Sequence, residues 1–248
     1  MYRSALPAIA VACILLSFLY CSKPLLKTTP EWEQWHGECP VIAIKFFPDD
    51  PYISDQDIVG TFFGISDTKE KFRRFVHSSI RELVFRRSSC KRIVMLEDSI
   101  TLNETSLTIR KDIRRSFHVP ADSLPDLVRR GITFLLLIEK YAVTFSKVYY
   151  DPAENAVQNS LFIQKKAIHP ELFEKKMPVK SNMRQSLKFV AVHCASGKIV
   201  QYGELTDEET YSHLNRDDFF EPIEEFMKDI FDKGPFSAKN DSYINENQ

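Results

Sequence analysis

Hydrophobic residues gather in a few short, dense runs along the chain, and these runs predict buried strands. Val41–Phe47 (VIAIKFF) and Arg92–Leu96 are rich in strand-forming residues and are shorter than typical helices. Ile132–Ile138 (ITFLLLI) contains no charged residue, so we predict that it is the central strand, buried on both faces. It continues as a more polar strand through Tyr150.

Two long segments show the spacing of amphipathic helices. In Phe72–Arg87 the apolar residues fall on one stripe, which predicts a helix that packs on a core. Asp217–Asp232 shows a comparable stripe and predicts a closing helix. The two apolar stripes are Phe72, Phe75, Val76, Ile80, Leu83 and Val84 in the first segment, and Phe219, Phe220, Ile223, Phe226, Met227, Ile230 and Phe231 in the second.

Two further helices are predicted between the second and third strands. Thr105–His118 has three apolar residues, each four positions from the next, which is helical spacing. A shorter helix is opened by Asp122 or Ser123, with Pro125 in its first turn and Gly131 just past its end. This follows the usual preference for proline inside the start and glycine after the end of a helix.

The remaining segments predict a hairpin and a loop, and the order of elements predicts the fold class. Leu187–Thr206 consists of two strand-like runs around Ala195–Lys198, where Gly197 suits a tight turn. A loop through Gly60 and Gly64 is expected after the first strand. Helices and strands alternate early and a hairpin comes late, so we predict an α/β fold with a mixed sheet of about four to five strands packed with helices.

The amino terminus has the layout of a bacterial lipoprotein signal. Arg3 supplies a charge, Ala5–Tyr20 has none, and Cys21 ends the run before the polar segment Ser22–Lys27. The run of about 16 residues is shorter than a membrane span and suits the apolar part of a signal peptide. Tyr20 stands where a small residue usually precedes the acylated cysteine. An uncleaved anchor or ordinary signal cleavage are the alternatives, and all three place the rest of the chain outside the cytoplasmic membrane.

These features divide the chain into four parts. Residues 1–21 are the predicted signal, with Cys21 as the lipidation site, and residues 22–39 are a predicted tether whose Trp32 and Trp35 pack on the domain. Residues 40–236 form one α/β domain with an irregular excursion over residues 151–186. The polar tail, residues 237–248, is predicted to be disordered.

Composition and cysteine usage narrow the function classes. The chain has 248 residues, is 44% hydrophobic and carries a formal net charge of −1, so no global positive field favours nucleic acid. Beyond Cys21, the cysteines are Cys39, Cys90 and Cys194, whose spacing matches no metal site. One disulfide is possible in an oxidising compartment, but we predict three buried thiols.

No motif in the sequence places a catalytic group. The six histidines lie at no metal-binding spacing, and no nucleophile or phosphate-binding motif is complete. His193 and Cys194 are adjacent, but neighbouring strand residues point to opposite faces and cannot pair. We therefore expect no enzyme activity, no cofactor, no metal and no small-molecule substrate.

The candidate binding surface is the basic face of the predicted Phe72–Arg87 helix. A cluster of positive side chains can steer an acidic protein partner toward that face. The alternative is a face that is merely solvated, as most charged helix faces are. The arginines concerned are Arg73, Arg74, Arg81, Arg86 and Arg87.

The order of these elements resembles the periplasmic domains of the curli-secretion (CsgG-like) lipoproteins and of the lipoprotein activators of penicillin-binding proteins. The TolB amino-terminal domain shares that fold. The resemblance covers roughly Pro40–Lys233 and departs from the family pattern at Ile132, Thr133 and Cys194. The segments that carry it are Val41–Phe46, the helix Phe72–Arg87, the strand Arg92–Leu96, Arg130–Leu137 and Cys194–Gly203.

The resemblance implies an envelope lipoprotein, anchored in the outer membrane and facing the periplasm, that binds another envelope protein and carries no catalytic residues. The alternative is a subunit of an oligomeric outer-membrane secretion channel of the curli type. The only long insertion, Ala142–Ser186, contains Lys165-Lys166 and Lys175-Lys176 and lacks sustained apolar–polar alternation, which argues against a pore.

Overall fold

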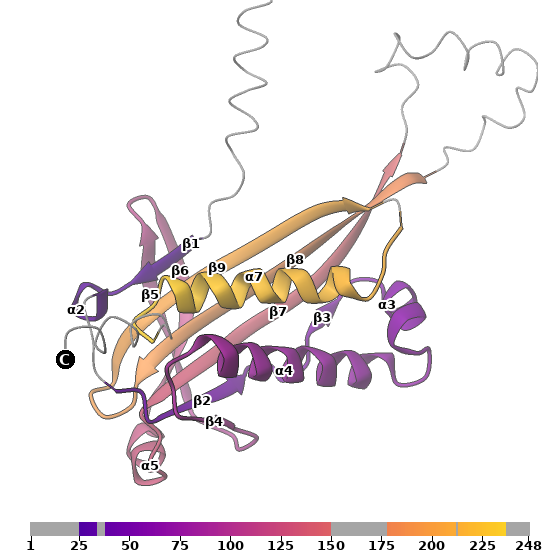
Figure 1. Cartoon of the computed structure of the whole chain (residues 1–248). Helices are drawn as coiled ribbons and strands as arrows, with labels where there is room; N and C mark the ends of the chain where they lie inside the picture. Colours follow the sequence, from indigo (N-terminus) through magenta and orange to yellow (C-terminus); the bar gives the residue numbers. More distant parts are fainter. Residues whose placement is uncertain (1–24, 34–37, 150–177, 212, 237–248) are drawn as a thin grey trace, which may run out of the picture.

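The structure, a computed structural model, describes residues 25–33, 38–149, 178–211 and 213–236 (Figure 1). The predicted signal with Cys21, most of the predicted excursion and the predicted tail lie outside the described residues. None of the described helices is long and apolar enough to cross a membrane.

A mixed seven-stranded sheet forms the centre of the described fold. Its strands are β1 (Leu25–Thr28), β2 (Val41–Phe46), β3 (Tyr52–Ile53), β4 (Arg92–Met95), β7 (Phe134–Tyr149), β8 (Pro178–His193) and β9 (Lys198–Tyr211). They are ordered β1-β9-β8-β7-β2-β4, and β3 pairs with β7. β2 is parallel to β4 and β7, whereas β7, β8, β9 and β1 are antiparallel neighbours. The α/β class with a mixed sheet is confirmed, with more strands than the four or five predicted.

The predicted central strand is confirmed as β7. It lies between β2 and β8, so that Leu136 is opposite Ile44 on one side and Ala191 on the other. All three of these residues are fully buried. Because helices cover one face of the sheet and a hairpin covers the other, a strand in this position must be apolar on both faces.

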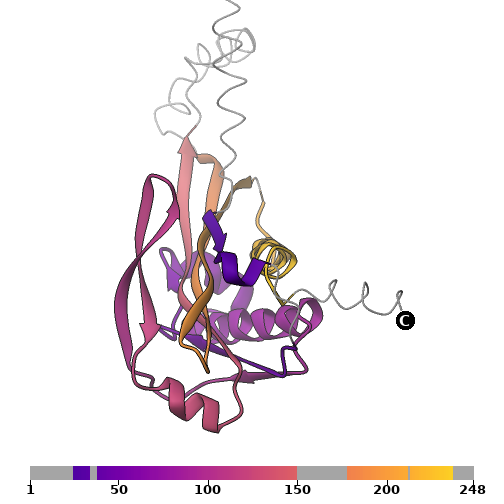
Figure 2. The same cartoon turned by 90° about the vertical axis from the view of Figure 1, so that its left-hand side faces the viewer.

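Five helices are described: α2 (Pro30–Glu33), α3 (Gln56–Phe63), α4 (Thr68–Arg87), α5 (Leu124–Arg129) and α7 (Asp217–Asp232). The predicted helices at α4, α5 and α7 are confirmed. α4 and α7 lie side by side over one face of the sheet (Figures 1 and 2), with Phe72 and Phe219 in edge contact beneath them. α3 replaces part of the predicted loop: Asp55 caps it by accepting a hydrogen bond from the Ile58 amide at 3.1 Å, and Gly64, at φ 100°, ends it.

The prediction of a helix over Thr105–His118 is wrong. The segment forms an antiparallel hairpin, β5 (Leu102–Arg110) and β6 (Ile113–Pro120), which covers the opposite face of the sheet (Figure 2). A spacing of four is even, so it also places apolar residues on one face of a strand. Ile109 and Phe117 use that face to pack on β7, β8 and β9.

Residues 25–33 belong to the folded layer rather than to a tether. β1 pairs with β9 at the edge of the sheet, and α2 follows it directly. The prediction that Trp32 packs on the domain is confirmed, because the residue is 8% exposed and its ring centroid lies 5.7 Å from that of Phe134.

The prediction of three buried thiols is wrong, because Cys39 and Cys90 form a disulfide. Their Cα atoms are 4.5 Å apart although 51 positions separate them in the sequence. The cause is the parallel pairing of β2 with β4, which places Val41 opposite Arg92 and so brings together the segments that enter both strands. Cys194 is free and buried.

The predicted hairpin is confirmed, but its strands are longer than predicted. β8 begins at Pro178, inside the segment predicted as an irregular excursion, and β9 reaches Tyr211. β7, β8 and β9 together extend beyond the level of α4 and α7 (Figure 1).

Candidate functional site

The five arginines proposed from the sequence all lie on α4, but they form two separate groups. Arg73, Arg74 and Arg81 line a cleft, whereas Arg86 and Arg87 lie in the last turn of the helix, outside it. The division follows position along the helix, because the part of α4 that carries Arg73 to Arg81 faces the cleft and Arg86 and Arg87 lie beyond it.

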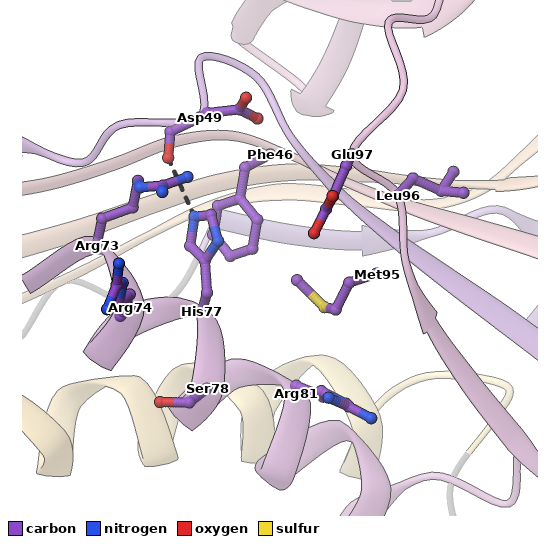
Figure 3. Close-up of a pocket in the computed structure, with 10 residues that line it drawn as sticks. All are labelled: Phe46, Asp49, Arg73, Arg74, His77, Ser78, Arg81, Met95, Leu96 and Glu97. Carbon is purple, nitrogen blue, oxygen red and sulfur yellow. Dashed lines mark hydrogen bonds between the residues drawn. The ribbon is translucent and has the colours of Figure 1, made fainter. Parts of the chain in front are cut away.

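The cleft lies between α4 and the carboxyl ends of the parallel strands β2 and β4 (Figure 3), and its volume is about 520 Å³. In open α/β sheets this is the end of the strands where ligands commonly bind. Strand residues supply its apolar part, and α4 with two acidic residues supplies its polar part. The lining residues are Phe46, Asp49, Arg73, Arg74, His77, Ser78, Arg81, Met95, Leu96 and Glu97.

The floor of the cleft is a stacked pair of rings. The centroids of Phe46 and His77 are 3.8 Å apart, with 15° between the planes. The His77 Nε2 atom lies 3.0 Å from the carbonyl oxygen of Asp49, to which a neutral ring donates a hydrogen bond. Burial, assisted by the nearby Arg73, lowers the pKa of His77 below its usual 6.5. The ring is therefore neutral at pH 7 and adds no positive charge to the cleft.

Two of the cleft arginines are held by carboxylates. Arg73 lies 2.7 Å from Glu70 and 3.9 Å from Asp50, and Arg74 lies 2.7 Å from the same Glu70 carboxylate. Hydrogen bonds from Arg74 and Arg73 lower the pKa of Glu70, which stays ionised. These pairs position the two guanidinium groups and neutralise much of their charge.

Arg81 is the cleft arginine without such a partner among the described residues. Its side chain is exposed, and no described carboxylate lies within ion-pair distance of it. Two carboxylates, Asp49 and Glu97, also line the cleft, and the charges of Arg73 and Arg74 are largely offset by Glu70 and Asp50. The positive feature of the cleft is therefore Arg81, which lies at its rim above an apolar floor.

The other two arginines have different surroundings. Arg86 pairs with Glu82 on the exposed side of α4. Arg87 lies 2.9 Å from Glu224 and is 24% exposed, so it links α4 to α7. We assign Arg86 to the solvated surface and Arg87 to helix packing.

Sequence reasoning missed a second cavity, of about 430 Å³, which lies beside the hairpin and is lined in part by His118, Glu139 and Lys188. Glu139 lies in its floor at an irregularity in the β7–β8 register, and its side chain is 2% exposed. One carboxylate oxygen accepts a hydrogen bond from the His118 amide, and the other lies 2.7 Å from Lys188 Nζ. The hydrogen bond from the His118 amide attaches β6 to the sheet, and Lys188 balances the buried charge of Glu139. The only sequence signal of this arrangement is a charged residue directly after the apolar run of β7.

The neighbouring His193 and Cys194 do not form a reactive pair, as their strand positions predicted. His193 Nδ1 is 2.8 Å from the Ser196 hydroxyl, and Cys194 is 2% exposed. Burial raises the pKa of the Cys194 thiol to about 12, which keeps it protonated. Within the described ranges, no cluster of three or more histidine, cysteine or acidic residues is placed to hold a metal ion.

Comparisons with known proteins give only distant likenesses. No family model and no curated protein matches the chain. Two structures of the PelC dodecamer from Paraburkholderia phytofirmans match at 8% and 9% identity, with TM-scores of 0.35 and 0.38. The matches cover 82% and 86% of this chain and 94% and 98% of PelC.

A third match is a homolog of a neuraminyllactose-binding hemagglutinin from Helicobacter pylori. It is 9% identical, covers 87% of this chain and 94% of that protein, and has a TM-score of 0.39. All three likenesses are too weak to carry a statement about function.

Proposed function

We propose that this chain is a bacterial envelope lipoprotein, anchored through Cys21 in the outer membrane and facing the periplasm, whose α/β domain binds another envelope protein without catalysis. The observation that carries the binding role is the cleft beside α4, where Arg81 has no described ion-pair partner. The charge of Arg81 above an apolar floor suits an acidic segment of a protein partner that also presents one apolar side chain.

The disulfide supports the proposed location. Disulfides persist in oxidising compartments such as the bacterial periplasm and are rare in the reducing cytosol. Cys39 and Cys90 are joined within the fold, close to where β2 and β4 begin. A chain built around such a bridge is suited to the space outside the cytoplasmic membrane.

The position of β1 limits how far the domain can stand from its anchor. Only four chain steps separate Cys21 from Leu25, where β1 begins, and fully extended they span about 14 Å. If Cys21 is acylated, the edge of the sheet therefore lies close to the membrane surface rather than at the end of a long tether.

Anchoring is tested by fractionation. Protein acylated on Cys21 should stay with membranes through a high-salt wash, because hydrocarbon insertion does not depend on ionic strength. Cys21→Ser should release the protein or block its processing. Wild-type fractionation and mobility of this variant would exclude Cys21 as the anchor.

Partner binding is tested by site-specific photocrosslinking in the native envelope. A benzophenone amino acid at Ser78, in the cleft, should give a defined adduct with one envelope protein, and the same group at the exposed Lys228 on α7 should not. Arg81→Glu should weaken the Ser78 adduct, whereas Arg86→Glu, on the same helix outside the cleft, should leave it unchanged. No adduct at Ser78, or equal yields with both variants, would count against the cleft.

The second candidate function is a subunit of a curli-type secretion channel. The observation that favours it is the length of β7, β8 and β9, with 16, 16 and 14 residues. The outer part of β9 includes Asp207, Glu208 and Glu209, which suits water better than hydrocarbon. Conductance steps from purified protein in planar bilayers would favour the channel over the interaction module.

A further inference from the structure

The tip of the β5–β6 hairpin carries a compact group of positive charges. A two-residue turn, Lys111 and Asp112, joins the strands, and Arg110, Arg114 and Arg115 flank it. All five side chains are exposed. Four basic residues and one acidic residue thus occupy six consecutive positions at the end of a protruding element.

This tip lies beside the point where the chain enters the sheet from Cys21. Leu25, the first residue of β1, is opposite Glu204 of β9, and Arg115 of β6 is 3.2 Å from the same Glu204. Two positions back along β9, the Tyr202 hydroxyl donates a hydrogen bond to the Thr108 carbonyl oxygen at 2.8 Å. These contacts hold the hairpin against β9, and β5 also packs against β1. Figures 1 and 2 show the tip of the hairpin on the side from which β1 enters the sheet.

The basic residues at the tip differ in their ion pairs and hydrogen bonds. Arg115 is paired with Glu204, and Arg114 donates a hydrogen bond from Nε to the Thr108 hydroxyl at 3.4 Å. No described carboxylate lies within ion-pair distance of Lys111 or Arg114. The tip is also held firmly, because Ile109 and Phe117 below it are buried against the sheet. Its orientation relative to β1 is set by the fold.

We propose that the β5–β6 tip binds the anionic phospholipid headgroups of the membrane in which Cys21 is anchored. The choice of membrane rests on the proposed anchor, whereas binding of the tip to anionic lipid does not. With at most about 14 Å between Cys21 and Leu25, the surface that holds the anchor lies within reach of the element beside Leu25. Basic residues near an anionic surface add attraction, and an acyl chain with a basic patch holds a protein more stably than one chain alone.

The test measures binding of the chain from Ser22 to Gln248, which contains every described element, to sedimenting vesicles. The vesicles are phosphatidylcholine alone or an equal mixture of phosphatidylcholine and phosphatidylglycerol, at low ionic strength. Wild type should bind the mixed vesicles and not the neutral ones. Lys111→Gln with Arg114→Gln should lower the partition coefficient roughly thirtyfold, since each basic residue contributes about fivefold.

The control is Arg129→Gln with Arg130→Gln, at the carboxyl end of α5, which removes the same formal charge near the base of the hairpin and away from its tip (Figure 1). It should leave binding unchanged, and both variants should melt like wild type because the replaced side chains are exposed. Equal losses in the two variants, equal binding to both kinds of vesicle, or binding to polyglutamate but not to mixed vesicles would overturn the proposal. If one of these results is obtained while the fractionation assay supports acylation of Cys21, lipid binding by the tip is rejected and the proposed anchor is retained.

Discussion

The molecule has two arginine-rich regions, and their surroundings differ. On α4, Arg73, Arg74, Arg86 and Arg87 all have carboxylate partners, and Arg81 alone of the five has none described. At the β5–β6 tip the acidic residues are fewer, and Lys111 has no described ion-pair partner. The longer run of arginines is therefore the more fully paired one: one of its five arginines lacks a described carboxylate partner, whereas at the tip both Lys111 and Arg114 lack one. Pairing, rather than the number of charges, decides what each region can attract.

The two regions also differ in what holds them. α4 is packed against α7 and is followed closely by the disulfide at Cys90, so that the cleft depends on helix packing. The tip depends on the hairpin, which is attached to the sheet by apolar packing and by the hydrogen bond from the His118 amide to the buried Glu139. A substitution that weakens the packing of α4 should therefore impair binding at the cleft only, and one that weakens the attachment of the hairpin should impair binding at the tip only.

The largest effect is expected from loss of the disulfide. Cys39→Ser with Cys90→Ser should lower the free energy of unfolding by about 4 kcal/mol, because the bridge closes a loop with a sequence separation of 51. Urea titration measures the change. In protein that remains folded, adduct formation at Ser78 should fall while vesicle binding persists. An unchanged urea midpoint would show that the bridge is not formed in the native protein.

Removal of the buried carboxylate should have the next largest effect. Glu139→Ala leaves Lys188 without its partner and the His118 amide without an acceptor, at a cost of about 2–3 kcal/mol, less than for a fully buried pair because Lys188 is partly exposed. Vesicle binding should weaken with it, and crosslinking at Ser78 should not.

A double variant serves as the control for that change. Glu139→Leu with Lys188→Met should recover much of the lost stability, because an apolar pair of similar size needs no charge partner. Equal melting temperatures for Glu139→Ala and wild type would show that the pair does not hold the hairpin.

Substitutions of the two arginines in the last turn of α4 should differ in their effect on the stability of the fold. Arg87→Ala should cost about 1 kcal/mol, because it removes a half-buried contact between α4 and α7, whereas Arg86→Ala should change little. Thermal unfolding at low ionic strength measures the difference. If Arg86→Ala is the more destabilising variant, the assignment of the two residues is wrong.

The smallest effect concerns pH. The pKa of His77 is lowered in the folded state, so its stabilising contribution is present above about pH 6.5 and is lost as pH falls through the folded-state value. Between pH 7 and pH 5 the wild type should therefore lose more stability than His77→Phe. His193, whose pKa is lowered in the same direction, remains in both proteins and cancels in the comparison. Parallel pH profiles for the two proteins would argue against a buried neutral His77.

Much of the fold could be predicted because its elements carry unambiguous periodicity. α4 and α7 have apolar stripes that fit a helix and not a strand, and the apolar run at the start of β7 has the length and composition of a buried strand. The β5–β6 hairpin could not be predicted in this way. Ile109, Ile113 and Phe117 are four positions apart, which fits one face of a helix and one face of a strand equally well.

The candidate site was only partly predictable for a related reason. Helical spacing shows that Glu70 can reach Arg73 and Arg74, because these are local pairs. It does not show that Asp50 approaches Arg73 or that Glu224 approaches Arg87, because these partners belong to other elements. The basic residues of Arg110–Arg115 were visible, but a helix prediction for that segment hid the fact that they form a tip.

The sequence by itself determined the α/β class, the long helices and the central strand, because each depends on a local pattern of burial. Tertiary structure alone decided the cysteine pairing, the place of Leu25–Thr28 in the sheet, and which arginines keep uncompensated charge. Those features depend on residues far apart in the chain, such as Cys39 and Cys90 or Leu25 and Glu204. A residue pattern reports the environment that a side chain needs, and only the packed fold determines which distant group supplies it.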